Sequence, residues 1–300
     1  MASEGKELVS VSSISSGKTS CLMALKYPTD VYLFACVCID YLQAKPKDPA
    51  VLKYCLEKLN GNFIASAEHE KSLKIMMQLE QLIGKEIKWV RGKSFDELLW
   101  ESPKKAMPSH LHRWCTTDMK IMPIFEYCWF NYGKVKMNIG FRMDEVERAY
   151  IFKKGEPPIR KVFDTIKYPI SCNNFGAKNQ NWDNEIAWRE KNYPLIDDRI
   201  FHYNVVNFWA TEHPEFKFPH DSNCQNCHHK PKEQIKKNHQ ESPEILEWAA
   251  EQEHMKKAAG AAIYTWHDDK VMYSDTFNMK SKKMQLQLDF TMCNSGYCTD

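Results

Sequence analysis

Residues 8–25 constrain the fold of this chain more than any other stretch. Leu8, Val9 and Val11 form a short apolar run that predicts a buried strand, and residues 21–25 give the apolar face of a helix. A strand, a tight turn and a helix N-terminus direct backbone N–H groups and the positive end of the helix dipole toward one point. The stretch therefore predicts a phosphate or pyrophosphate site. The loop residues expected around the anion are Ser15, Ser16, Gly17, Lys18, Thr19 and Ser20.

Two features of this loop leave another interpretation open. The usual P-loop reads Gly-x-x-x-x-Gly-Lys-Ser/Thr, but Ser12 occupies the position of its first glycine. A serine-rich turn can also do no more than cap a helix. The loop alone does not decide between a nucleotide site and a cap.

Apolar and helical patterns alternate after this loop. Residues 31–39 are almost wholly apolar and rich in β-formers, which is typical of a central parallel strand buried on both faces. Further strands are expected over 63–65, 87–90 and 134–139, and helices over 49–59, 72–83 and 203–212. This rhythm predicts an α/β fold with a doubly wound, mostly parallel sheet. Asp40 follows the central strand, at the end where such sheets bind ligands.

The later part of the chain is more polar. Residues 151–185 contain two consecutive prolines and an asparagine-rich run, so we expect an irregular insertion there, with a last strand over 193–197. From Pro214 onward the pattern changes to helices and cysteines. The predicted domains are a nucleotide-binding domain over 1–213 and a helical appendage with a metal knuckle over 214–300.

Eleven cysteines are present, and they bear on both location and metal binding. The chain opens without a signal peptide pattern, and no stretch approaches the ~20 apolar residues of a membrane span. We therefore expect no membrane association and a cytoplasmic protein with reduced thiols, in the host cytoplasm if the chain is phage-encoded. The net charge of +2 neither announces nor excludes a nucleic-acid partner.

Cys224 and Cys227 have the C-x-x-C spacing of a chelating knuckle. Structural zinc and iron–sulfur clusters both take four ligands. Cys115 and Cys298 are the candidates for the other two, with Cys293, His228 and His229 as alternatives. We favour a [4Fe–4S] cluster held by four cysteines, with Zn²⁺ and plain thiols as the alternatives. The predicted ligands are Cys115, Cys224, Cys227 and Cys298.

Four collinear stretches resemble one family. They are Ser15–Ser20, Arg113-Trp114-Cys115-Thr116, the residues 140–145 (Gly-Phe-Arg-Met-Asp-Glu) and the residues 193–197 (Tyr-Pro-Leu-Ile-Asp). Together they resemble the phosphoadenosine phosphosulfate reductase-like branch of the PP-loop ATP pyrophosphatases. The usual loop of these enzymes is Ser-Gly-Gly-Lys-Asp/Thr-Ser, from which Ser16 departs. The cysteines are similar to those of cysteine-bearing members, including phage-encoded homologues and DNA-phosphorothioation ATP pyrophosphatases.

The resemblance implies an adenine nucleotide α-hydrolase-like fold, with ATP or a related nucleotide over the strand ends. Arg113 and Asp40 are predicted nucleotide contacts. Gly140 lets the backbone approach the nucleotide closely. Arg142 can clamp a phosphate in a bidentate manner, and Asp144 and Glu145 can hold Arg142 or coordinate Mg²⁺. The residues predicted to act in catalysis are Lys18, Arg142 and Asp144, although a plain salt bridge at a strand end would also explain the last two.

Three functions remain open at this point. The first is an enzyme that cleaves ATP between the α- and β-phosphates and adenylates an acceptor, in sulfur transfer or in modification of DNA or tRNA. Its partners would be a nucleic-acid substrate, a sulfur donor protein and a second copy of the chain. The second is a phosphoadenosine or adenosine phosphosulfate reductase, although residues 296–300 do not match the Glu-Cys-Gly-x-His motif. The third is a non-catalytic nucleotide-binding protein on the same fold.

Overall fold

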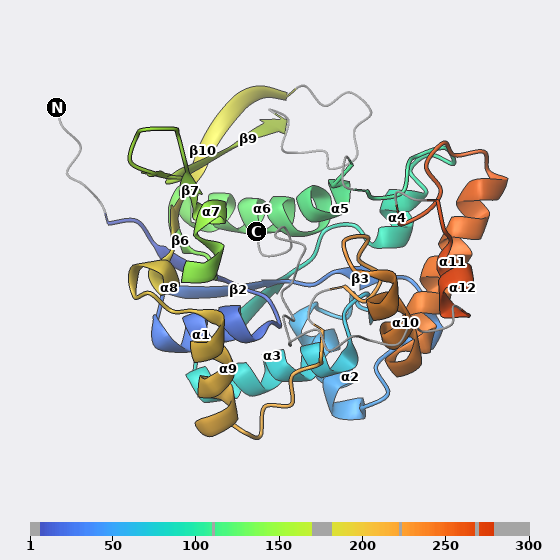
Figure 1. Ribbon diagram of the computed structural model, residues 1–300, viewed down its shortest axis with the longest axis horizontal. Coiled ribbons are helices and arrows are strands. Elements are labelled where there is room, and N and C mark those ends of the chain that lie inside the picture. Colours follow the sequence, from blue (N-terminus) through green and yellow to red (C-terminus); the bar gives the residue numbers. More distant parts are fainter. Residues whose placement is uncertain (1–6, 110–111, 170–181, 222–223, 268–269, 279–300) are drawn as a thin grey trace.

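The computed structural model describes residues 7–109, 112–169, 182–221, 224–267 and 270–278, and its architecture is α/β (Figure 1). The strands are β1 (Ser10–Ile14), β2 (Val31–Ala35), β3 (Cys38–Ile39), β4 (Ala65–Ser66), β5 (Ile87–Val90), β6 (Val135–Asn138), β7 (Tyr150–Ile151), β8 (Ile159–Arg160), β9 (Phe163–Pro169) and β10 (Trp182–Asn192). The helices are α1 (Lys18–Lys26), α2 (Pro49–Lys58), α3 (Glu70–Ile83), α4 (Phe95–Leu99), α5 (Trp114–Thr116), α6 (Met122–Tyr132), α7 (Val146–Ala149), α8 (Pro194–Asp197), α9 (His202–Thr211), α10 (Lys232–Glu241), α11 (Pro243–Ala258) and α12 (Tyr273–Phe277). Shorter turns are η1 (Leu42–Ala44), the π-helical η2 (Thr117–Ile121) and η3 (Met143–Glu145).

A six-stranded, mostly parallel sheet forms the centre, in the order β5-β2-β1-β6-β10-β9. β1 runs parallel to both of its neighbours, β2 and β6. β2 and β6 in turn run parallel to β5 and β10, whereas β9 and β10 form an antiparallel pair at one edge. Parallel neighbours need crossover connections, and these place helices on the faces of the sheet.

Both faces of the sheet are covered, because alternate strand residues point to opposite sides. In β2, Tyr32 and Phe34 pack with residues of α1, α2 and α3. Val31 and Leu33 pack instead with Ile124 and its neighbours in α6. Figure 1 shows this layering, with α6 above the sheet and α1 and α3 below it. None of the helices in the described ranges has both the length and the apolar composition that a membrane span requires.

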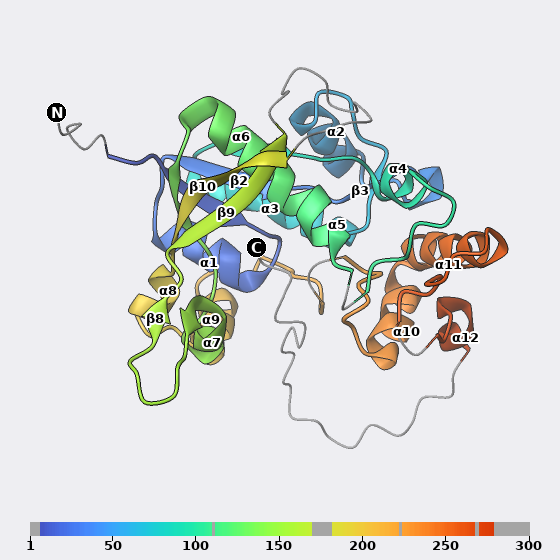
Figure 2. The same cartoon turned by 90° about the horizontal axis from the view of Figure 1, so that it is seen from above.

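A further group of buried residues, the C-terminal core, joins α10, α11 and α12 to α4 and β3. Trp248 Nε1 donates to Asp96 Oδ1 at 2.9 Å. The buried Lys256 donates to the carbonyl oxygens of Leu99 and Ser102, which satisfies the C-terminal end of α4. Figure 2 shows these C-terminal helices together at one end of the molecule, away from β9 and β10. Polar contacts as well as apolar packing therefore fix this region.

The prediction of one strand over 31–39 is wrong in part. β2 ends at Ala35, and β3 pairs antiparallel with β4 in a separate two-stranded sheet. The strand expected over 63–65 therefore lies outside the central sheet. Every residue from 31 to 39 is buried, so the apolar pattern does not reveal the break between β2 and β3.

The expected irregular insertion over 151–185 is also corrected by the structure. β9 and the start of β10 lie within it and complete the central sheet. Their polar composition reflects ion pairs between strands. Arg189, 1% exposed, donates from Nε to Asp164 Oδ2 at 3.0 Å, and Lys191 pairs with the same Asp164 carboxylate at 3.3 Å. A strand whose charges are paired in this way does not show an apolar pattern.

The expected last strand over 193–197 is wrong as well, because Pro194–Asp197 forms α8. Pro194 stands at its start, where the fixed φ of proline suits a helix. The strands expected over 87–90 and 134–139, and the helices expected over 49–59, 72–83 and 203–212, are confirmed to within two residues.

Glu253 in α11 makes part of this fold pH-dependent. Its fully buried carboxylate accepts hydrogen bonds from the backbone N–H groups of Trp266 at 2.9 Å and Tyr273 at 2.6 Å. Burial raises the pKa of Glu253 from 4.5 to about 8, although these N–H groups oppose the shift. In this range the native state keeps a proton that the unfolded chain has lost. The Glu253 contribution to the free energy of unfolding should therefore fall as pH rises from about 4.5 to about 8, by at most about 1.4 kcal/mol per pH unit.

Urea unfolding at several pH values in this window checks the expectation. Glu253→Gln should lower stability by about 1–3 kcal/mol, because its amide N–H₂ leaves one backbone N–H without an acceptor. It should also show a weaker pH dependence than the wild type. Glu251→Gln, at an exposed position of the same helix, should keep the wild-type dependence. Parallel pH profiles for the wild type and Glu253→Gln would contradict the assignment.

Candidate functional site

The predicted anion loop lies between β1 and α1, and Ser20 holds it in shape. The Ser20 hydroxyl accepts from the Ser15 backbone N–H at 3.0 Å and lies 2.8 Å from the Ser15 carbonyl oxygen, to which it can donate. It also lies 2.9 Å from the Ser15 hydroxyl. Since Ser20 is only 3% exposed, these contacts occupy its hydroxyl. Ser20 therefore shapes the cradle from within.

The start of α1 is not capped by any side chain, and Gly17 is its N-cap. The interpretation of the loop as a serine cap is therefore wrong. The amide groups of an uncapped first turn are the donors that an anion uses. Ser16 is fully buried, and its hydroxyl has no hydrogen-bond partner within the described ranges.

Lys18 lies at the exposed beginning of α1, beside an aromatic wall. Its Nζ is 5.9 Å from the centre of the Phe218 ring. Its carbonyl oxygen accepts from Trp209 Nε1 at 2.9 Å, so α9 is tied directly to the loop. This wall of Trp209 and Phe218 is absent from the residues predicted by motif, because nothing in the sequence connects it with the loop.

The residues that follow β6 lie against the same loop. A Cβ at Gly140 would lie 3.1 Å from Ser20 Cα, tighter than an ordinary van der Waals contact, so the two backbones approach closely here. Arg142 Nη1 donates to the Thr19 hydroxyl at 2.9 Å. Its Nε and Nη2 donate to Asp144 at 3.1 and 2.9 Å. The structure thus brings Gly140, Arg142 and Asp144 to the loop, from a position more than a hundred residues along the chain.

Asp144 is engaged by two donors. Besides Arg142, the His202 backbone N–H donates to its Oδ1 at 3.1 Å. Burial opposes ionisation, but Arg142 and the backbone donors hold the pKa of Asp144 below its ordinary value. Glu145 is similarly occupied, 3.2 Å from Arg142 and 2.7 Å from Arg148. Of the two roles predicted for these carboxylates, holding Arg142 is the one that this geometry serves.

A small recess opens beside the loop, at the carboxyl ends of β1 and β2. Its volume is about 20 Å³, which is room for about one or two water molecules. It is lined by Ser13, Ile14, Ser15, Ser20, Phe34, Ala35, Glu68, Lys120, Ile124 and Gly140. The recess is therefore an inward extension of the loop site.

Glu68 and Lys120 are the charged residues of this lining, and motif reasoning assigns neither of them a role. Glu68 is 3% exposed, and its Oε2 has no hydrogen-bond partner among the described residues. Burial raises the pKa of Glu68 to about 7, against the opposing effect of Lys120 and Lys230. The sequence does contain one indication of Glu68. It comes shortly after the short strand expected over 63–65, much as Asp40 comes after the longer strand expected over 31–39.

The cysteine knuckle docks on the same segment as Glu68. Cys224 forms an antiparallel β-bridge with Glu68, and the Gln225 N–H donates to the Ala67 carbonyl oxygen at 2.7 Å. The turn closes through the Cys227 N–H and the Cys224 carbonyl oxygen at 3.2 Å. Residues 67 and 68 therefore join the knuckle to the recess.

Cys115 in α5 and Cys224 are both half-buried and pack against the C-terminal core. Cys227 is half-buried too, whereas Cys298 and Cys293 lie outside the described residues. Within the described ranges, no three His, Cys, Asp or Glu side chains form a group suited to a metal ion. The four-cysteine site stays a prediction.

Two predicted nucleotide contacts lie apart from the recess lining. Asp40 follows β3 rather than the central strand, and its carboxylate accepts from the Ser94 hydroxyl. Its backbone N–H donates to Asp96 Oδ2 at 2.7 Å, which ties it to α4. Arg113 is the residue just before α5 and is half-buried. Asp40 is displaced because the strand that was expected to end at residue 39 breaks after Ala35.

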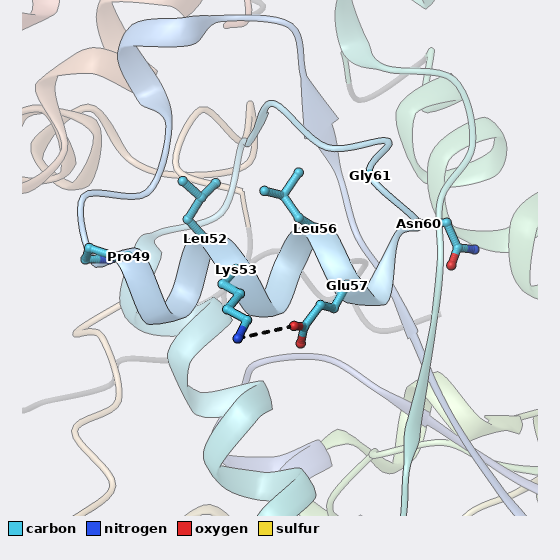
Figure 3. Close-up of a pocket in the computed structure, with 7 residues that line it drawn as sticks. All are labelled: Pro49, Leu52, Lys53, Leu56, Glu57, Asn60 and Gly61. Atoms are coloured by element: carbon cyan, nitrogen blue, oxygen red, sulfur yellow. Dashed lines mark ion pairs between the residues drawn. The ribbon is translucent and has the colours of Figure 1, made fainter.

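A larger hollow, about 510 Å³ in volume, lies on the outer face of α2 (Figure 3). Its lining is Pro49, Leu52, Lys53, Leu56, Glu57, Asn60 and Gly61. Leu52 and Leu56 stand side by side, and Lys53 pairs with Glu57 at 3.8 Å. None of these residues belongs to the loop, the recess or the knuckle. Size alone does not make this shallow, mainly apolar face a site of chemistry.

Comparison of the chain with protein-family models, with curated proteins and with solved structures gives no match. The assignment of function therefore rests on the geometry of the loop, the recess and the knuckle.

Gly140→Ala should destabilise the protein by about 1–3 kcal/mol, because the added methyl meets the backbone of Ser20 and forces the loop outward. Gly155→Ala is the matched control. Gly155 has φ +77° but open space around its Cβ position, so its cost should be the backbone strain alone, about 1 kcal/mol. Urea unfolding of both variants measures the difference. Equal losses would show that the contact with Ser20 is not tight.

Proposed function

We propose that this chain is an enzyme of the PP-loop ATP pyrophosphatase type, which binds ATP or a related adenine nucleotide and cleaves or activates it at the α-phosphate. The observation that carries the proposal is the closed loop before α1, with Arg142 anchored on Thr19 beside it. Lys18, Arg142 and an uncapped helix N-terminus then surround one loop. Such an arrangement suits a polyphosphate.

The strand order supports the doubly wound, adenine nucleotide α-hydrolase-like arrangement that we propose for the sheet. From β1 the sheet extends to β2 on one side and to β6 on the other. Ligands of open α/β sheets bind at such a switch point, outside the carboxyl ends of the strands. The loop follows β1 and Gly140 follows β6, and these two segments are in contact. The helices after residue 214 are then an appendage to this sheet.

The proposed chemistry is electrostatic. Lys18 and the first amides of α1 would stabilise the negative charge that develops on the leaving pyrophosphate. Arg142 would hold the α-phosphate through its guanidinium, with Asp144 as the residue that positions it. Mg²⁺ would supply further neutralisation of the phosphates. The contribution of this chain is to fix these groups before the nucleotide arrives.

We further propose that the activated group serves sulfur transfer or nucleic-acid modification, with a DNA or tRNA group as the acceptor and a sulfur donor protein as a partner. The position of the knuckle supports this, because Cys224 is bridged to Glu68 in the lining of the recess. A [4Fe–4S] cluster on Cys115, Cys224, Cys227 and Cys298 would then lie next to the nucleotide. Zn²⁺ at the same cysteines is the alternative.

Release of pyrophosphate from ATP tests the nucleotide reaction, in the presence of candidate acceptors. Lys18→Ala should slow the release about 100-fold, because one charged donor to the leaving group is lost. Lys26→Ala is the matched control, since Lys26 lies in the last turn of the same helix and pairs with Asp198 at 3.5 Å. It should keep the wild-type rate.

Two outcomes would contradict this part of the proposal. Equal rates for Lys18→Ala and the wild type would remove the loop from the reaction. Tight ATP binding by the wild type without pyrophosphate release under any acceptor would favour a nucleotide-binding protein without catalysis.

Iron, zinc and sulfide analysis of anaerobically purified protein, with an absorption spectrum, tests the cysteine site. The wild type should contain iron and sulfide with broad absorption near ~400 nm, and Cys224→Ala should lose both. Cys128→Ala is the control, because Cys128 is buried in the core between α6 and the sheet. Zinc without iron would make the knuckle structural, and protein without metal would contradict the four-cysteine site.

A further inference from the structure

Glu68 has a buried carboxylate that needs a cation or a hydrogen-bond donor as its partner. Its Oε2 is shielded from solvent and lacks a hydrogen-bond partner in the part of the chain that the structure describes. An ionised carboxylate in such surroundings is costly unless a cation or donor group compensates it. Glu68 lines the recess, so its counterpart can arrive there with a ligand.

The size of the recess restricts that counterpart. A volume of about 20 Å³ is room for about one or two water molecules, and it is far too small for a purine or a ribose. A nucleotide on the loop would cover the recess without filling it. An occupant of this size is an ion or a water molecule, which would lie between Glu68 and a phosphate bound at the loop.

The lining favours a hard cation. Ser13 and Ser15 share the recess with Glu68, whereas the Ser20 hydroxyl, which also lines it, is already engaged within the loop. Mg²⁺ prefers oxygen ligands and commonly takes one or two carboxylates, several waters and the phosphates of its substrate. Lys120 also lines the recess, but it and Lys230 only partly offset the effect of burial on the Glu68 carboxylate. The added phosphates then bring negative charge that a divalent cation offsets.

The other carboxylates near the loop are already engaged. Asp144 accepts from Arg142 and from the His202 N–H. Glu145 is paired with Arg142 and Arg148. A metal ion on either would have to displace an arginine, whereas Glu68 Oε2 has no described hydrogen bond to lose.

We propose that Glu68 is the carboxylate ligand of the Mg²⁺ ion that accompanies the nucleotide on the loop. The inference rests on the proposed function, since it supposes a nucleotide at that loop. It moves the metal from Asp144 and Glu145, where the motif suggests it, to a residue of the segment 67–68.

Calorimetric titration with ATP, once in excess Mg²⁺ and once in EDTA, tests this site. The wild type should bind ATP about tenfold or more tightly with Mg²⁺ than in EDTA. Glu68→Gln, which keeps the shape of the side chain, should bind ATP in EDTA like the wild type but lose the gain from Mg²⁺. Asp144→Asn, the rival site, should weaken binding equally in both conditions because it loosens Arg142. Glu57→Gln, an exposed carboxylate of α2, is the neutral control.

The possible results distinguish a failure of the Glu68 assignment from a failure of the proposed function. A wild type that binds no ATP in either condition would overturn the proposed function, and the inference with it. ATP binding with the full gain from Mg²⁺ in Glu68→Gln would overturn the inference alone. Mn²⁺ electron paramagnetic resonance provides a second readout. With ATP present, Glu68→Asp should retain a bound Mn²⁺ signal that Glu68→Gln loses, and equal signals in the two variants would also overturn the inference.

Discussion

The contact between Gly140 and Ser20 is the constraint on which the candidate site depends. It brings the end of β6 against the first turn of α1, where a Cβ at Gly140 would lie 3.1 Å from Ser20 Cα, tighter than an ordinary van der Waals contact. Because the two backbones touch, Arg142 reaches Thr19 with its guanidinium and Asp144 can hold that guanidinium in place. Ser20 also closes the loop from inside, so one residue serves both the shape of the cradle and its junction with the neighbouring strand.

The sequence predicts this part of the structure well, for a physical reason. The loop is local, and a strand, a turn and a helix with Gly17 and Lys18 leave few alternatives. Central strands and their covering helices also follow from apolar periodicity. The predictions fail where burial or charge hides the pattern. The break after Ala35 lies in a fully buried run, and β9 and β10 are disguised by ion pairs such as Arg189–Asp164.

The site itself is less predictable, because its most informative residues are distant in the chain and match no motif. Glu68 is meaningful only through its burial and its position at the recess. Trp209 is meaningful only because its indole reaches the Lys18 carbonyl oxygen. Asp40 is a residue that the sequence wrongly places in the site. It is selected because it follows the strand expected over 31–39, but the central strand β2 ends at Ala35. Contacts of this kind can be recognised only once the fold is known.

One segment ties the two halves of the site together. The Ala67 N–H donates to the Val37 carbonyl oxygen at 2.9 Å, and the Ala67 carbonyl oxygen accepts from the Gln225 N–H at 2.7 Å. Glu68, the next residue, turns its side chain to the recess and bridges its backbone to Cys224. A shift of the knuckle must therefore either break these hydrogen bonds or move Glu68. Since both faces of the segment are buried, moving it would also disturb the C-terminal core. The knuckle and the recess therefore share one rigid segment. The position of Glu68 depends on the backbone contacts of the knuckle as well as on the loop.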